Sequence, residues 1–165
     1  MLIEDVRQTT TPTQVEGRSG VQRVLVAFDG SDGAWAALAR GIEVAVSSRA
    51  LLTIAAVAEE PSFLVGLGPA TCPVTRESLR VDIERAMLLH LAGARDEVPA
   101  TVSVTTQLLH GKPARALAAF AEDGRYDLVV TGPRLVSRWR RMFRRSVTHA
   151  LLSHGVTSVL AVKAH

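Results

Sequence analysis

The chain has 165 residues, of which 47% are hydrophobic and 21% are charged, and its formal net charge at pH 7 is +3. This length suits one globular domain with a filled core, and two domains would be cramped. The one cysteine, Cys72, excludes an intramolecular disulfide, and no apolar stretch reaches the roughly 20 uncharged residues of a membrane span. The composition predicts a protein of the reducing cytoplasm, with no membrane association.

The first twenty residues are polar and rich in threonine and glutamine, and an apolar run follows them abruptly. They carry acidic residues early and no continuous apolar segment, which argues against a secretory signal. We therefore interpret residues 1–20 as a flexible N-terminal arm and residues 21–165 as the folded domain.

The folded part opens with a strand, a helix and a second strand. Residues 23–28 form a short apolar and β-branched run, and the turn and capping residues Asp29, Gly30 and Ser31 follow it. Apolar side chains then recur at helical spacing as far as Ala45, and residues 51–57 return to a continuous apolar run.

A long surface connection is expected at residues 59–73, where prolines and glycines replace periodicity. Thr75 then offers an N-cap for a helix that carries an apolar residue at nearly every fourth position as far as Leu91. Residues 101–109 alternate with more polar residues than the other predicted strands do, as the edge of a sheet would.

The last third continues the alternation. Gly111 turns the chain and Pro113 begins a helix, because proline is tolerated in the first turn. The remaining predicted elements are a strand at 128–131, a helix at 146–153 and a strand at 158–163.

Strands that alternate with helices imply an α/β fold with one parallel five-stranded sheet, helices on both faces and right-handed crossovers. The strand orders 2-1-3-4-5 and 3-2-1-4-5 both fit, and the polar third strand favours 3-2-1-4-5. In that order the winding reverses between strands one and four, and ligands are expected at their carboxyl ends. These ends carry Asp29 and Gly132.

Three stretches, VLVAFDGSDGAWAAL, HGKPARALAAFA and DLVVTG, with a later serine and SVLAV near the end, resemble the universal stress protein family over about residues 21–162. The resemblance implies an adenine-nucleotide alpha-hydrolase-like fold with strand order 3-2-1-4-5, a cytoplasmic homodimer and a role in surviving stress. It implies no general catalytic reaction, and some members of the family bind ATP whereas others do not.

The ATP-binding members carry a glycine, two residues, a second glycine, nine residues and then Gly-Ser or Gly-Thr. In this chain Gly132 and Ser146 match the two ends of that motif, whereas Leu135 and Arg145 replace glycines. The added Cβ atoms, and the N–H that Pro133 lacks, weaken a backbone cradle for phosphate. We therefore expect no cofactor and little ATP affinity.

Residues 134–145 contain six arginines and no acidic residue. Their six positive charges exceed the formal net charge of +3 of the whole chain. The leading hypothesis makes this loop a docking surface for an acidic protein partner or an anionic metabolite. Trp139 and Phe143 lie among the arginines, but one short loop lacks the extended groove of single-strand binders, so nucleic acid is not favoured.

The alternative hypothesis is an ATP-binding member, with Mg²⁺ and slow ATP hydrolysis. Its nucleotide site would comprise Asp29, Gly132, Arg134, Arg145 and Ser146. Each residue also has a simpler interpretation, because a turn aspartate, a turn glycine and a helix N-cap occur in most folds. No catalytic residue and no metal ligand is predicted.

The final apolar run has a consequence for assembly. Strand order 3-2-1-4-5 places residues 158–163 at an edge of the sheet, where an uncovered apolar strand favours aggregation. Pairing with the same strand of a second subunit would cover that edge, so we predict a homodimer through Ser158 to Lys163. Coverage by a terminal segment of the same chain is the alternative.

Overall fold

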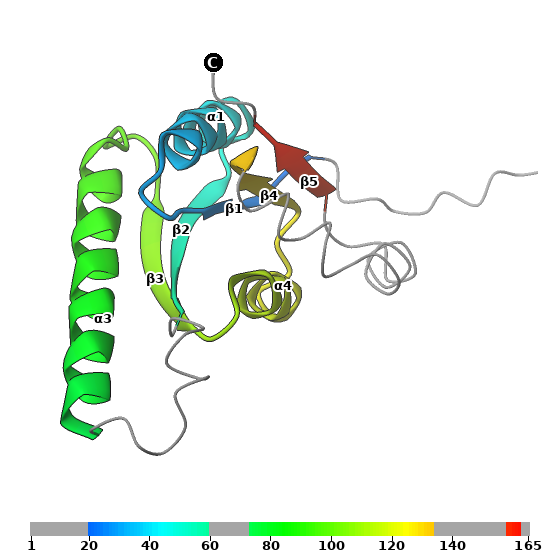
Figure 1. Cartoon of the computed structure of the whole chain (residues 1–165). Helices are drawn as coiled ribbons and strands as arrows, with labels where there is room; N and C mark the ends of the chain where they lie inside the picture. Colours follow the sequence, from blue (N-terminus) through cyan, green and yellow to red (C-terminus); the bar gives the residue numbers. More distant parts are fainter. Residues whose placement is uncertain (1–19, 60–72, 134–157, 163–165) are drawn as a thin grey trace, which may run out of the picture.

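The computed structural model describes residues 20–59, 73–133 and 158–162. Its elements in chain order are β1 (Arg23–Ala27), α1 (Asp32–Ser48), β2 (Leu51–Ala58), α3 (Pro73–Asp96), β3 (Val104–His110), α4 (Pro113–Asp123), β4 (Leu128–Thr131) and β5 (Ser158–Ala161) (Figure 1).

The strands form one five-stranded sheet in the order β3-β2-β1-β4-β5, and every neighbouring pair is parallel. The predicted order 3-2-1-4-5 is therefore confirmed, with the polar strand β3 at one edge and β5 at the other. The prediction of helices on both faces is also confirmed: α1 and α3 pack on one face of the sheet and α4 packs on the other (Figure 1).

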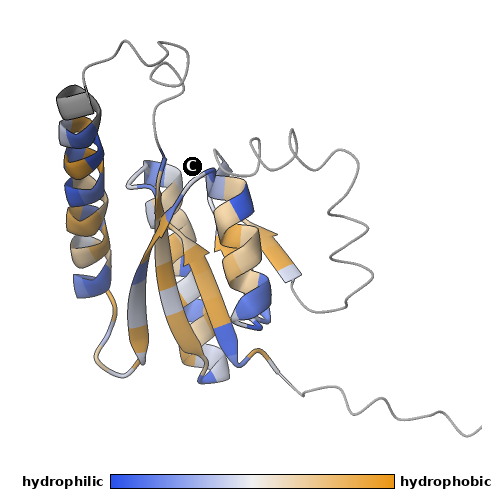
Figure 2. Cartoon of the chain, turned by 90° about the horizontal axis from the view of Figure 1, so that it is seen from below, coloured by the Kyte–Doolittle hydropathy of each residue, from blue (hydrophilic) through white to orange (hydrophobic). Residues whose placement is uncertain are grey.

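The central strands are apolar on both faces because both faces are covered. In β1, Val24 and Val26 face the core beneath α1 and α3, whereas Leu25 and Ala27 face α4. Figure 2 shows this apolar colouring gathered on the central strands and more polar colouring on β3. The same alternation in β2 buries Leu52 and Ile54 on the α1 side.

Helix α1 begins where the sequence predicts. Ser31 adopts an extended conformation as its N-cap, and the Ser31 hydroxyl accepts a hydrogen bond from the backbone N–H of Ala34. The helix buries small residues against β1, and at Gly41 an added Cβ would lie 2.4 Å from Val26 Cγ2. Helix α1 therefore packs closely against β1.

Several boundaries differ from the prediction by a few residues, and β2 and β3 each extend one residue past the predicted end, to Ala58 and His110. Helix α3 begins at Pro73, before the predicted N-cap Thr75, because proline is well suited to the first position of a helix. Strand β3 begins at Val104, because residues 99–102 turn, with the N–H of Val102 donating to the carbonyl of Pro99. Strand β1 ends at Ala27, one residue short of the predicted end.

The predicted arm at 1–20 lies almost wholly outside the described residues, as do most of the connection at 59–73 and the helix at 146–153. Strand β5 ends at Ala161, short of the predicted end at residue 163. Val162 is described and is not part of the strand, and Lys163 lies outside the described residues. Within the part of the chain that is described, no helix has the length and apolar character needed to cross a membrane.

Candidate functional site

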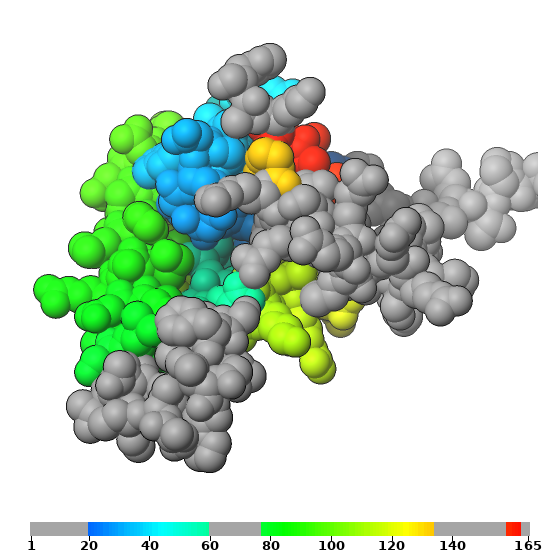
Figure 3. All heavy atoms as spheres, viewed as in Figure 1, coloured from blue at the N-terminus to red at the C-terminus, as the bar shows by residue number. Residues whose placement is uncertain are grey.

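A pocket of about 520 Å³ opens at the carboxyl ends of β1, β2 and β4. The winding of the sheet reverses between β1 and β4, so the pocket lies at the carboxyl ends of the strands on either side of this switch point. Helices α1, α3 and α4 surround it, and Figure 3 shows the surface of β2 between α3 and α4 on this side of the molecule. The volume lies within the range of sites for small molecules and cofactors.

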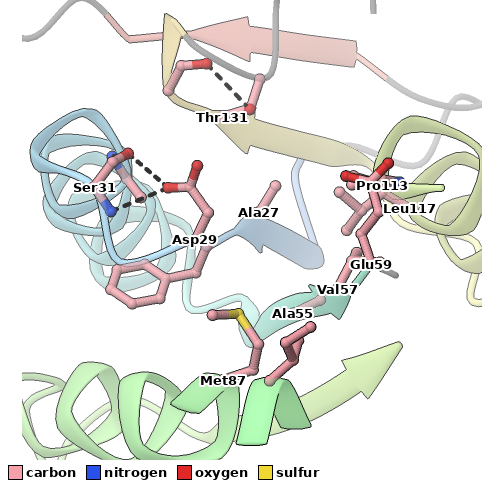
Figure 4. A pocket seen from close by; sticks show the side chains of 14 residues that line it. Ala27, Asp29, Ser31, Ala55, Val57, Glu59, Met87, Pro113, Leu117 and Thr131 are labelled. Atoms are coloured by element: carbon pink, nitrogen blue, oxygen red, sulfur yellow. Dashed lines mark hydrogen bonds between the residues drawn. The ribbon is translucent and has the colours of Figure 1, made fainter. Parts of the chain in front are cut away.

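The interior of the pocket is apolar. Ala27 and Ala55 form its floor, and because both side chains are small, the floor lies deep between the helices. Met87 of α3 and Leu117 of α4 project from different sides, as Figure 4 shows, and Val57 of β2 lies between them. A flat, weakly polar group would be desolvated on both faces here.

The rim of the pocket is polar. Asp29 follows β1, and its Oδ1 accepts hydrogen bonds from the backbone N–H of Ser31 at 3.1 Å and from the Ser31 hydroxyl at 2.6 Å (Figure 4). Asp29 therefore orients the residue that caps α1, as the simpler interpretation of a turn aspartate predicts. Glu59, directly after β2, places a second carboxylate at the rim.

The first turn of α1 points its N-terminus at the same opening. Ser31 and Ala34 both line the pocket. The unpaired N–H groups and the dipole of a helix N-terminus favour a negative charge at this point. Among the described lining residues there are two carboxylates and no basic side chain. Helix N-termini therefore supply positive potential there, both from α1 and from α4, whose first residue, Pro113, also lines the pocket.

Gly132 follows β4, lines the pocket and packs against α1. A Cβ built on Gly132 would lie 2.6 Å from the carbonyl oxygen of Gly33, and a Cβ on Gly33 would lie 2.6 Å from Cδ of Pro133. The hydroxyl of the preceding residue, Thr131, donates to the carbonyl of Gly132 at 3.3 Å. Gly132 therefore lacks room for a side chain where it packs against α1, and it also lines the pocket.

The structure brings together two of the five predicted site residues. Asp29 and Gly132 both line the pocket, one at the end of β1 and the other at the end of β4. Arg134, Arg145 and Ser146 lie outside the described residues, as do Trp139 and Phe143.

Sequence reasoning did not identify the other lining residues. Glu59 could have been found, because it directly follows a strand that is adjacent to β1. Met87, Ile83 and Leu117 gave no separate signal, since their helical spacing is that of ordinary core residues.

Within the described ranges, no three histidine, cysteine, aspartate or glutamate side chains lie close enough to hold a metal ion. The described lining also contains no histidine, cysteine or lysine. Its chemistry is that of an apolar cavity with hydroxyl and carboxylate hydrogen-bonding groups.

Two solved structures resemble this fold over nearly their whole length. One is a universal stress protein in complex with cAMP, with 25% identity, coverage of 89% of this chain and 100% of that chain, and a TM-score of 0.59. Another is a universal stress family protein from Burkholderia pseudomallei, with 24% identity, coverage of 87% and 97% respectively, and a TM-score of 0.60.

The sequence comparisons give the same family. Universal stress protein YxiE of Bacillus subtilis (strain 168) is 28% identical over 146 residues, which are 86% of this chain and 98% of YxiE. The sequence model of the universal stress protein family matches residues 20–163. The chain therefore belongs to the universal stress protein family.

Proposed function

We propose that the protein is a cytoplasmic stress-response protein that acts by binding, and that its pocket holds an adenine nucleotide. The observation that carries this proposal is the position and lining of the pocket, which is apolar inside, polar at the rim and located where the winding of the sheet reverses. The similar universal stress protein crystallised with cAMP adds support for this class of ligand.

The apolar interior matches a purine base. In this proposal the base lies over Ala55 and Val57, between Met87 of α3 and Leu117 of α4. Sulfur and aliphatic groups pack favourably against aromatic rings, and the small floor residues leave room for the ring. The ribose hydroxyls would donate to the carboxylates of Asp29 and Glu59, because carboxylates are strong acceptors at the rim.

The phosphate end is expected at the N-terminus of α1, beside Gly132. Arg134 and Arg145, with the hydroxyl of Ser146, would supply the positive charge and further donors that the described lining lacks. Because Leu135 and Arg145 replace motif glycines, a long triphosphate has less backbone to contact than in the ATP-binding relatives. We therefore expect AMP or cAMP to bind at least as tightly as ATP with Mg²⁺, and no turnover.

A second candidate function is supported by the sequence of the arginine-rich loop. Its six arginines, without one acidic residue, form a cationic segment that suits an acidic protein partner. A homodimer through β5 accompanies either function, because β5 is an edge strand and Val159 is 42% exposed.

Calorimetric titration separates these functions. AMP, cAMP, and ATP with Mg²⁺ are titrated at low and moderate salt beside adenosine and inorganic polyphosphate. Binding that needs the adenosine part and persists in moderate salt is expected for the pocket. If polyphosphate binds as tightly as the nucleotides and moderate salt abolishes binding, the arginine-rich loop binds anions in general and does not recognise adenosine. No heat with any adenosine compound would overturn the nucleotide proposal.

A further inference from the structure

A second hollow, of about 410 Å³, lies at the amino ends of the strands, opposite to the first pocket at their carboxyl ends. It is formed by the last turn of α1, the first residue of β2 and residues 101–103 before β3. We name it the amino-edge groove, because the strands begin at this edge. None of its lining residues lines the first pocket.

Two large apolar side chains in this groove are half exposed. Val46 of α1 is 53% exposed and Leu51 of β2 is 54% exposed, although their neighbours Ala45 and Ala50 are buried. Single exposed apolar residues are common on protein surfaces, but two that line one hollow form a patch. The patch is apolar surface that a covering segment would remove from water.

A cation lies beside this patch in an unusual backbone conformation. Arg49 is the C-cap of α1 and adopts the left-handed region, with φ 53° and ψ 38°. Glycine is the favoured residue at such a position, so an arginine there is held against a conformational preference. The helix dipole favours a basic residue anywhere in the last turn of α1. It does not explain why the basic residue stands at the C-cap, where the left-handed conformation disfavours an arginine. Arg49 is exposed and forms no ion pair with a described residue.

The N-terminal part of the chain enters the fold beside this groove. The carbonyl of Gln22 accepts a hydrogen bond from the N–H of Leu51 at 2.8 Å, so residues 20–22 lie next to the start of β2. Gly20 has φ +111° and nothing within 4 Å of its Cβ position, which permits a sharp change of direction there.

The residues that precede Gly20 match the chemistry of the groove. Val15 is the nearest upstream apolar residue with a large side chain, and Glu16 beside it is the nearest acid. Four or five extended residues span up to about 16 Å, which is enough to reach from Gly20 across the start of β2 to the end of α1. Residues 12–19 thus carry one large apolar residue, Val15, one acid, Glu16, and one base, Arg18. Val15 and Glu16 complement a patch that has apolar groups and one cation.

We propose that residues 12–19 dock in the amino-edge groove, with Val15 against Val46 and Leu51 and with Glu16 paired to Arg49. Docking removes the exposed patch from water and gives the guanidinium a partner. It also holds the N-terminal segment at the amino ends of the strands, whereas the first pocket lies at their carboxyl ends.

Hydrogen exchange of the full chain tests this proposal. The amides of residues 13–19 are expected to exchange at least about tenfold more slowly than in an unstructured peptide. Leu51→Asp and Arg49→Glu should each remove this protection, and Glu16→Arg combined with Arg49→Glu should restore it. Leu89→Asp is the matched control, because Leu89 is 67% exposed on α3 and outside the groove.

Two results would overturn the proposal. One is exchange of residues 13–19 at the unstructured rate in the unaltered chain. The other is protection that disappears on dilution, which would assign the groove to a second copy of the chain. The amides of β1 report whether a variant is folded, and a disulfide between Val15→Cys and Val46→Cys in a Cys72→Ser background is a second readout. That disulfide should form within one chain, and failure to form it under oxidation contradicts docking.

Discussion

Gly33 and Gly132 lie in direct contact although 99 positions separate their numbers, and neither has room for a side chain. A Cβ on Gly132 would lie 2.6 Å from the carbonyl oxygen of Gly33, and a Cβ on Gly33 would lie 2.6 Å from Cδ of Pro133, the residue after Gly132. The chain that leaves β4 therefore crosses the first turn of α1 with backbone against backbone. This packing explains Gly132 without any bound phosphate.

We predict that Gly132→Ala lowers the free energy of unfolding by about 1–3 kcal/mol, because the neighbour it meets is backbone and cannot move aside. Gly93→Ala is the matched control, since Gly93 lies in α3 with nothing within 4 Å of its Cβ position. That control should raise stability by about 0.5–1 kcal/mol through helix propensity. Urea denaturation measures both, and an unchanged midpoint for Gly132→Ala would show that the contact is loose.

Filling the pocket should block nucleotide binding and leave the fold intact. Val57 lines the pocket and is partly exposed, so Val57→Trp extends a ring into the space assigned to the base. We expect a loss of at least about tenfold in affinity for AMP or cAMP, with little change in Tm. Leu89→Trp adds the same ring on the exposed face of α3 as a control. Equal affinity of the two variants would place the ligand elsewhere.

The position of the site could be predicted because a parallel sheet carries its ligands at the carboxyl ends of its strands. The polar residues of β3 identified an edge, which gave the strand order, and the order placed Asp29 and Gly132 at one opening. Each of these steps depends on which residues are polar and which are apolar along a strand, and this pattern can be read from the sequence.

The remaining features depend on distances between elements, which spacing along the chain does not give. Met87 and Leu117 have the helical spacing of core residues, and only the packing of α3 and α4 shows that they line a pocket. The sequence gives no signal for the packing role of Gly33, because its neighbours Gly132 and Pro133 are distant along the chain. The sequence predicts Thr75 as the N-cap although Pro73 begins the helix, because threonine and proline are both suited to helix starts.

The edge strand β5 provides a test of assembly. Val159 is 42% exposed on β5, so Val159→Glu places a charge where a second copy of the strand would pair. If the homodimer forms through this edge, light scattering should show a dimer for the unaltered chain and a monomer for the variant. Val81→Glu, at a 49% exposed position on α3, should leave the dimer intact. A monomer in the unaltered chain at high concentration would remove the edge-pairing argument.

A chain of hydroxyl groups links β3 and β2 to Tyr126, two residues before β4, and its Tyr126 and Thr53 members are buried whereas Thr105 is exposed. The Tyr126 hydroxyl donates to Thr53 Oγ1 at 3.0 Å, and Thr53 Oγ1 lies 3.0 Å from Thr105 Oγ1. We predict that Tyr126→Phe costs about 1 kcal/mol of stability, because the ring and its contact with the Arg23 guanidinium remain while one buried hydrogen bond is lost. A double-mutant cycle with Thr53→Val measures the pair, and additive effects would show that the two groups are not coupled.

The acidic and basic residues along the exposed face of α3 allow a prediction about pH. Hydrogen bonds from Arg80, together with its positive charge, lower the pKa of Glu77 below its ordinary value of 4.5. A lowered folded-state pKa stabilises the fold above the unfolded-state pKa, and this contribution is lost as the pH falls through the folded-state pKa. The effect on stability is small because the pair is exposed.

The pKa itself is the better measurement. Arg80→Gln should raise the pKa of Glu77 toward 4.5, as followed by the carboxyl ¹³C shift in an NMR titration. Arg85→Gln, one turn further along α3, removes the same charge without touching the Glu77 hydrogen bonds and should have a much smaller effect. Equal shifts in the two variants would mean that general charge, rather than the hydrogen bonds from Arg80, sets the pKa of Glu77.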